Sequence, residues 1–224
     1  MKFAVIICGQ ARTLNRSFLN YLDKENVNYD VFIHYWKPKN NGYTDCGNIY
    51  AAHTINNLPE NLHKKIIEIY KPKKIEFEEQ IEFKKDDMIK TPTNSTFRTI
   101  SNFYGCYKGF NIIENKEDYS HFIKIRFDFE FNESFTNIKE IDNNSIYFLR
   151  LLSESSLCDI FWLVPRNKQI LFNIYNFIYE TDIELDNISE HITMKFIDYH
   201  NLSNNLKKFS AECTIDRSYI KNIN

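Results

Sequence analysis

The sequence lacks the features that mark several large classes of protein. Its five cysteines are odd in number and include no Cys-x-x-Cys pair, so we expect no disulfide framework and a reducing compartment. The apolar run at 3–8 is shorter than the apolar region of a signal peptide and far shorter than a membrane span. We therefore expect a cytoplasmic protein with no membrane span.

An excess of charge of one sign is also missing. The 30 acidic and 28 basic residues leave a net charge of −2, which gives no general reason to bind nucleic acid or an anionic membrane. The chain contains no Gly-x-Gly-x-x-Gly motif and no P-loop, so dinucleotide-binding and ATPase functions lose their usual support. No internal repeat, Gly/Ser linker or low-complexity segment divides it.

The sequence does have enough apolar material for a packed core. Of 224 residues, 43% are hydrophobic and 16% are aromatic, which excludes a disordered chain. This length suits one sizeable domain better than two. We predict a single domain over residues 1–224.

Apolar runs alternate with segments of helical spacing along the chain. Strands are predicted at 3–8, 30–36, 75–77, 119–131, 146–149, 159–164 and 209–215, and helices at 13–22, 58–70, 95–114, 167–179 and 189–200. Loops are predicted at 38–47 and 83–94. This order predicts an α/β fold with a central, mostly parallel sheet flanked by helices.

Ligands of such sheets bind beyond the carboxyl ends of the strands, where three polar segments are expected here. The first is Gly9-Gln10-Ala11-Arg12. Gly9 lets the backbone approach a ligand, Gln10 can pair with a base edge, and Arg12 can hold a phosphate at the start of a helix. The same residues would equally suit an ordinary strand-to-helix turn.

The second segment is His34-Tyr35-Trp36, which ends the next predicted strand. Aromatic residues are more often core than carbohydrate platform, but this strand end is expected to face the cleft. We therefore expect His34 and Trp36 to contact substrate. The remaining histidines have no ligand-like spacing, so a zinc site is not expected.

The third segment is Arg126-Phe127-Asp128-Phe129-Glu130. Asp128 and Glu130, two positions apart on one strand face, could bind one Mg²⁺ or Mn²⁺ that neutralises a leaving diphosphate. The spacing alone is weak, because it recurs at Asp182-Ile183-Glu184. The context of an apolar strand and the neighbouring Arg126 favours the metal site over a solvated strand edge.

Two further acidic positions are candidates. Asp159 begins an apolar segment, where partial desolvation suits a general base, although a turn-capping role is equally consistent. Glu190-His191 opens a helix and could bind an acceptor hydroxyl or the donor's sugar. A Glu in a first helical turn is also favoured by the helix dipole alone.

Several of these segments together resemble small GT-A-type glycosyltransferases of large DNA viruses and bacterial surface-polysaccharide clusters. The resembling segments, which span roughly residues 3 to 200, are 3–13, 29–36, 101–108 leading to 119–128, and 159–162, with Glu190 further on. The resemblance implies a Rossmann-like GT-A fold that binds a nucleotide-sugar, a UDP- or GDP-sugar, over the first strand.

The resemblance also implies roles for individual residues. Gly9, Gln10 and Arg12 would lie near the nucleotide, and Ser101 and Asn102 would face the donor. Asp128 would match the last Asp of the family's metal motif, and Asp159 would match the acidic residue near the acceptor. The sequence departs from the motif because Arg126 stands where its first Asp would be. Mn²⁺ or Mg²⁺ would then rest on Asp128, with Glu130 uncertain.

The resulting hypothesis is metal-assisted sugar transfer from a nucleoside diphosphate sugar to a glycan hydroxyl, as in polysaccharide biosynthesis. Asp159 would deprotonate the acceptor if the reaction inverts. Two alternatives stay open. One is another nucleotide-dependent transferase or phosphohydrolase on a similar sheet. The other is a non-catalytic nucleotide-sugar-binding module, which the substituted metal motif permits.

Overall fold

The structure, a computed structural model, describes most of the chain. The described residues are 1–11, 13–37, 42–43, 55–56, 61–79, 94–149, 151–153, 156–157, 159–181 and 189–215. Their α-helices are α1 (Ser17–Lys24), α2 (Leu62–Tyr70), α3 (Asn94–Asn111), α4 (Ile174–Glu180) and α5 (Ser189–Tyr199). Short 3-10 helices are η1 (Lys116–Asp118), η2 (Arg166–Asn173) and η3 (Ser203–Asn205).

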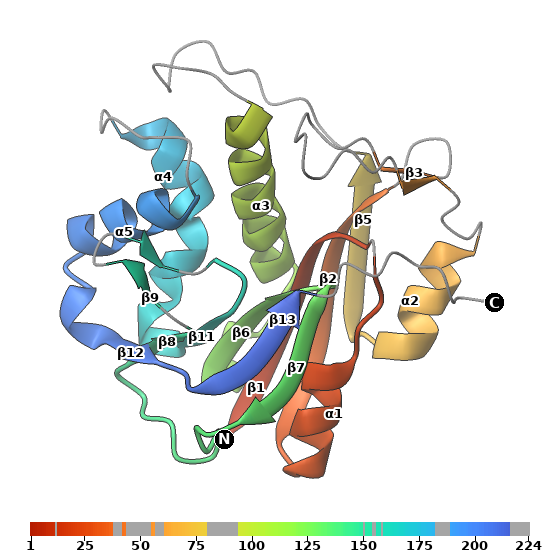
Figure 1. Cartoon of the computed structure of the whole chain (residues 1–224), viewed down its shortest axis with the longest axis horizontal. Coiled ribbons are helices and arrows are strands. Elements are labelled where there is room, and N and C mark those ends of the chain that lie inside the picture. Colours follow the sequence, from red (N-terminus) through yellow and green to blue (C-terminus); the bar gives the residue numbers. More distant parts are fainter. Residues whose placement is uncertain are drawn as a thin grey trace.

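A seven-stranded sheet forms the centre of the molecule (Figure 1). Its strands, in spatial order, are β12 (Leu206–Lys208), β8 (Ile146–Phe148), β11 (Trp162–Pro165), β6 (His121–Arg126), β1 (Lys2–Gln10), β2 (Asn28–Lys37) and β5 (Lys74–Glu79). β11 runs antiparallel to both of its neighbours, and every other pairing in this sheet is parallel. The prediction of an α/β fold with a mostly parallel sheet is confirmed.

Three small two-stranded sheets complete the described strands. They pair β7 (Phe129–Ser134) with β13 (Ala211–Ile215), β9 (Leu151–Ser153) with β10 (Ser156–Leu157), and β3 (Gly42–Tyr43) with β4 (Ile55–Asn56). The β3 strand falls inside the predicted loop 38–47. The rest of that loop, and the predicted loop 83–94 except Asn94, lie outside the described residues.

Helices cover both faces of the central sheet. Alternate β1 side chains point to opposite faces, as a strand requires. Ala4, Ile6 and Cys8 pack in one apolar cluster with residues of α3, α4 and α5. Val5 and Ile7 pack in another with residues of α1 and α2. Figure 1 shows these two helix groups on opposite sides of the strands. In the described part of the chain, no helix is long and apolar enough to cross a membrane.

The strand order reverses at β1. β2 and β5 extend to one side of β1, whereas β6, the next main-sheet strand along the chain, lies on its other side. In open α/β sheets, the crevice outside the carboxyl ends of the two strands at such a reversal is the usual ligand site. The topology therefore marks the ends of β1 and β6, at Gln10 and Arg126, as the first place to look for function.

The predicted single strand 119–131 is wrong, because the chain turns in its middle. β6 ends at Arg126, Phe127 and Asp128 form a turn, and β7 starts at Phe129. The Phe127 carbonyl accepts a hydrogen bond from the Asn15 backbone N–H, and both Phe127 and Phe129 are buried. β7 then pairs with β13 instead of extending the main sheet. Asp128 and Glu130 therefore do not share the face of one strand.

The predicted strand 159–164 and helix 167–179 also need correction. Asp159 and Ile160 form a bend, and β11 begins at Trp162. The predicted helix is the 3-10 helix η2 followed by the shorter helix α4. The other predicted helices agree with the structure to within a few residues at their ends.

Two glycines let α3 pack closely on β1. A Cβ at Gly109 would lie 2.7 Å from Ile6 Cγ2, closer than side chains tolerate. A Cβ at Gly105 would meet His34 Nδ1 at 3.6 Å, an ordinary contact. The helix backbone therefore packs directly against the strand at Gly109.

The paired substitutions Gly105→Ala and Gly109→Ala test this packing. Both gain the same helix propensity, about 1 kcal/mol. Only Gly109→Ala overpacks the core, which costs about 1–3 kcal/mol. Thermal unfolding should therefore give Gly109→Ala the lower Tm, by roughly 2–4 °C per kcal/mol. Equal Tm values would contradict this description.

Candidate functional site

The ends of β1 and β6 form the floor of the candidate site. Cys8 of β1 lies opposite Arg126 of β6 in the parallel register. Gly9 has a φ of 110°, a left-handed value that favours glycine, and a Cβ there would meet no described atom within 4 Å. Gln10 is the last residue of β1. Arg12, predicted to hold phosphate, lies outside the described residues.

Asp159 is held by two donors on one carboxylate oxygen. Asn102 Nδ2 of α3 donates to Asp159 Oδ2 at 2.7 Å. Ser189 Oγ, at the start of α5, lies 2.9 Å from the same Oδ2 and 3.0 Å from Glu190 Oε2. A hydroxyl has one proton, so Ser189 serves one of these carboxylates at a time. No described residue donates to Asp159 Oδ1, which leaves that oxygen to accept a proton or a hydrogen bond.

Lys124 of β6 lies next to Asp159 and is fully buried. Its Nζ donates to the Asp159 main-chain oxygen, and lies 3.5 Å from Asn102 Oδ1 and 5.0 Å from the centre of the Trp162 ring. A buried ammonium needs such partners to offset its lost hydration. Because Lys124 can only donate, it fixes the Asn102 amide with its oxygen toward Lys124 and its nitrogen toward Asp159.

Arg126 and Asp128 form a bidentate ion pair at the end of β6. Arg126 Nε lies 2.9 Å from Asp128 Oδ1, and Nη2 lies 2.6 Å from Oδ2. The Asp128 side chain is 10% exposed and that of Arg126 is 34% exposed. Burial alone would lower the pKa of Arg126, but the Asp128 carboxylate and, to a smaller extent, Asp159 raise it. The guanidinium therefore stays charged and is the more accessible partner.

The pKa of the buried Cys8 thiol is lowered at this edge of the sheet. The hydrogen bond with Cys106 is the largest cause that lowers the pKa of Cys8; burial opposes it, and Lys124 and Arg126 lower it further. Cys8 and Cys106 are both buried, free thiols. Lys124 and Arg126 are two positions apart on β6, so their side chains lie on the same face of the sheet.

The side chains around Asp128 do not form a ready divalent-metal site. Both Asp128 oxygens face the Arg126 guanidinium, a cation that would repel a metal ion placed there. Glu130 Oε2 accepts a hydrogen bond from Thr214 Oγ1 across the β7–β13 ribbon. Among the described residues, no group of three or more His, Cys, Asp or Glu could hold a metal. Mn²⁺ or Mg²⁺ at Asp128 and Glu130 stays a prediction that this arrangement does not fit.

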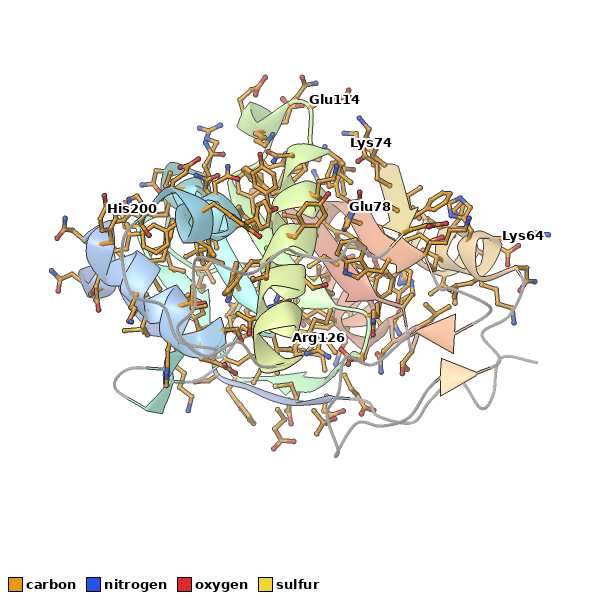
Figure 2. The ribbon with its side chains drawn as sticks, turned by 90° about the horizontal axis from the view of Figure 1, so that it is seen from above. Lys64, Lys74, Glu78, Glu114, Arg126 and His200 are labelled. Atoms are coloured by element: carbon orange, nitrogen blue, oxygen red, sulfur yellow. The ribbon has the colours of Figure 1, made fainter. Side chains whose placement is uncertain are left out.

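His34 and Trp36 are buried and contact neighbouring side chains. His34 is fully buried, and its Nε2 lies 2.7 Å from Glu78 Oε1. Trp36 is 1% exposed and stacks on Tyr104 of α3, with ring centres 5.4 Å apart. In Figure 2, Glu78 lies on the β5 side of α3, well separated from Arg126. The predicted substrate contacts of His34 and Trp36 are untested.

The structure brings together some predicted residues and not others. Asn102, Asp159 and Glu190 share one hydrogen-bonded cluster through Ser189, and His191 follows in the same first turn of α5. Ser101 is buried in α3 next to Asn102. Glu130 lies apart, on the β7–β13 ribbon.

The sequence-based prediction missed three residues that contact the predicted site residues. Lys124 has a visible signal, because a charged residue interrupts the apolar run 122–125. Ser189 lies at the start of α5, and nothing in the sequence indicates that its hydroxyl reaches Asp159. Glu78 lies on the short strand β5 and has no distinguishing context in the sequence.

Comparisons with known proteins add one finding. No family model matches the chain, and no curated protein matches it by sequence. The chain is similar to the crystal structure of a glycosyltransferase involved in the glycosylation of the major capsid of PBCV-1. The TM-score is 0.42 at 9% sequence identity, over 93% of this chain and 81% of that one. At this distance the similarity does not identify a family.

Acidification should destabilise the fold through His34. Burial lowers the pKa of His34 below its ordinary value of 6.5, against the opposing effect of Glu78. Among the described residues its Nδ1 has no hydrogen-bond partner, so a second ring proton would be buried without an acceptor. Below about pH 6.5 the unfolded chain binds this proton and the folded chain does not, so stability falls as the pH drops.

Urea unfolding of the wild type and His34→Gln at pH 7.5 and pH 5.5 measures this effect. We expect the stability loss between these pH values to be smaller in His34→Gln. It should not vanish, because burial also lowers the pKa of His121 and His200. An unchanged loss would show that His34 does not titrate differently on folding.

Proposed function

We propose that the protein is a glycosyltransferase of the GT-A type that moves a sugar from a nucleoside diphosphate sugar to a glycan hydroxyl. The observation that carries this proposal is that a guanidinium, Arg126, and a carboxylate, Asp159, both lie at the strand-order reversal. There, the main-chain oxygen of Asp159 accepts a hydrogen bond from Lys124, which precedes Arg126 by two residues on β6. The sequence resemblance to small GT-A-type enzymes supports the same function.

The donor would lie across the carboxyl ends of β1 and β6. The open space over Gly9 would admit the nucleotide close to the backbone, and Gln10 would pair with the base edge. Arg126 would face the diphosphate, because its side chain is the more exposed member of its ion pair. Whether the nucleotide is UDP or GDP, and which sugar it carries, are to be found by experiment.

Asp159 would act as the base in an inverting reaction. Its Oδ1, which no described residue occupies, would take the proton from the acceptor hydroxyl while Asn102 and Ser189 hold Oδ2. The acceptor oxygen would then form its bond to the anomeric carbon. The bond from that carbon to the diphosphate would break, and the nucleoside diphosphate would leave with the electron pair.

Glu190 and His191 would border the acceptor side of the site. Glu190 shares the Ser189 hydroxyl with Asp159, so its carboxylate lies next to the proposed base. An acceptor sugar presents hydroxyl donors that such carboxylates bind.

Replacement of Asp159 by Asn tests the proposed base. The substitution removes the proton acceptor and keeps the shape, so kcat should fall about 10²–10⁴-fold. Donor affinity should change little, because Asp159 would face the acceptor. Turnover is followed as nucleoside diphosphate released together with glycosylated acceptor. Glu114→Gln, a carboxylate change at an exposed ion pair with Lys74, is the matched control.

The product analysis separates the alternative functions. Release of nucleoside diphosphate with transfer of the sugar is the expected result. Cleavage within the diphosphate, with no sugar moved, would indicate a phosphohydrolase and contradict the proposal. Donor binding without turnover over a panel of glycan acceptors would indicate a non-catalytic binding module.

A further inference from the structure

We propose that the Arg126 guanidinium, held by Asp128, is itself the cation that meets the donor's diphosphate, so that donor binding needs no divalent metal. This inference rests on the proposed function and deepens it. It reverses the expected roles of the two residues. Asp128 positions Arg126, and Arg126 touches the ligand.

The first argument is the order of burial within the pair. The Asp128 side chain is 10% exposed, whereas the Arg126 side chain is 34% exposed. A ligand that approaches from solvent therefore meets the positive member first. A metal site would need the reverse order, with the carboxylate oxygens facing the ligand.

The second argument is the number of donors that remain on Arg126. A guanidinium has five N–H donors in a fixed fork. Asp128 takes one from Nε and one from Nη2, which leaves three. No described residue accepts from those three. Their planar arrangement suits two phosphate oxygens, and Arg is the side chain best adapted to such pairing.

The third argument is electrostatic. A divalent ion on Asp128 would lie close to a guanidinium that donates hydrogen bonds to both oxygens of that same carboxylate. The two positive charges repel each other, and Mg²⁺ gives up its water ligands reluctantly. Lys124, on the same face of β6 two residues earlier, adds to the positive potential that favours an anion. The site therefore already carries the charge that a metal would bring.

The fourth argument is positional. Arg126 ends β6 at the strand-order reversal and lies opposite Cys8, next to the open space over Gly9. This is the crevice where the diphosphate of a nucleotide would lie in an open α/β sheet. The helix α3, which carries Asn102, packs on this end of β1, since a Cβ at Gly105 would lie 3.7 Å from the Gly9 backbone nitrogen. One crevice thus presents a cation for the leaving group and a carboxylate for the acceptor.

Titration of the full-length chain with UDP and with GDP by calorimetry tests the inference, in EDTA and in Mn²⁺. For the nucleotide that binds, we expect Kd values in the two conditions to agree within about twofold. Arg126→Gln should weaken binding by about tenfold or more. Arg126→Lys, which keeps the charge and loses the fork, should weaken it less. Arg166→Gln, an exposed arginine at the start of η2, should bind as the wild type does.

A double variant keeps the test decisive if Arg126→Gln leaves Asp128 unpaired and fails to fold. Arg126→Gln combined with Asp128→Asn removes both charges, keeps a hydrogen-bonded pair, and should show the same loss of affinity. Binding that requires Mn²⁺ and is abolished by Asp128→Asn alone would overturn the inference and leave the proposed function standing. Unchanged binding by the double variant would also overturn it. Binding of neither nucleotide would overturn the proposed function together with the inference.

Discussion

The arrangement of the candidate site depends on the close approach of α3 to the first strand. Gly109 lets the helix backbone settle against Ile6, where even a methyl group would overlap. This close packing positions Asn102 above the carboxyl ends of β1 and β6. From there the Asn102 side chain donates a hydrogen bond to Asp159. It also sets Tyr104 against Trp36. A helix held farther away would break these contacts together.

Charge is distributed across this edge so that each buried ion has partners. Lys124 is stabilised by the Asp159 carbonyl, Asn102 and the Trp162 ring. Arg126 is stabilised by Asp128. Such arrangements are costly unless fully paired, and they specify orientation more than stability. Here they leave Asp159 Oδ1 and part of the Arg126 guanidinium without described partners, and these are the groups through which the protein would act on a ligand.

Much of the fold could be predicted from the sequence, because its signals are local. Continuous apolar runs indicated β1 and β2, and helical spacing indicated α3. The turn at Phe127 could not be predicted, because it depends on the distant backbone of Asn15. Asp159 and Asn102 were predicted as separate candidates. Their contact, like that of Asp159 with Ser189, arises from packing between segments far apart in the chain.

The most direct test of the account is a crystal structure with a bound nucleoside diphosphate. The account predicts that the diphosphate lies over the carboxyl ends of β1 and β6, within hydrogen-bond distance of Arg126, with Asp128 still paired behind it. A nucleotide bound elsewhere, for example in the hollow of about 440 Å³ between Phe110 and Arg166, would contradict the account. So would a diphosphate that contacts Asp128 through a metal ion while Arg126 points away.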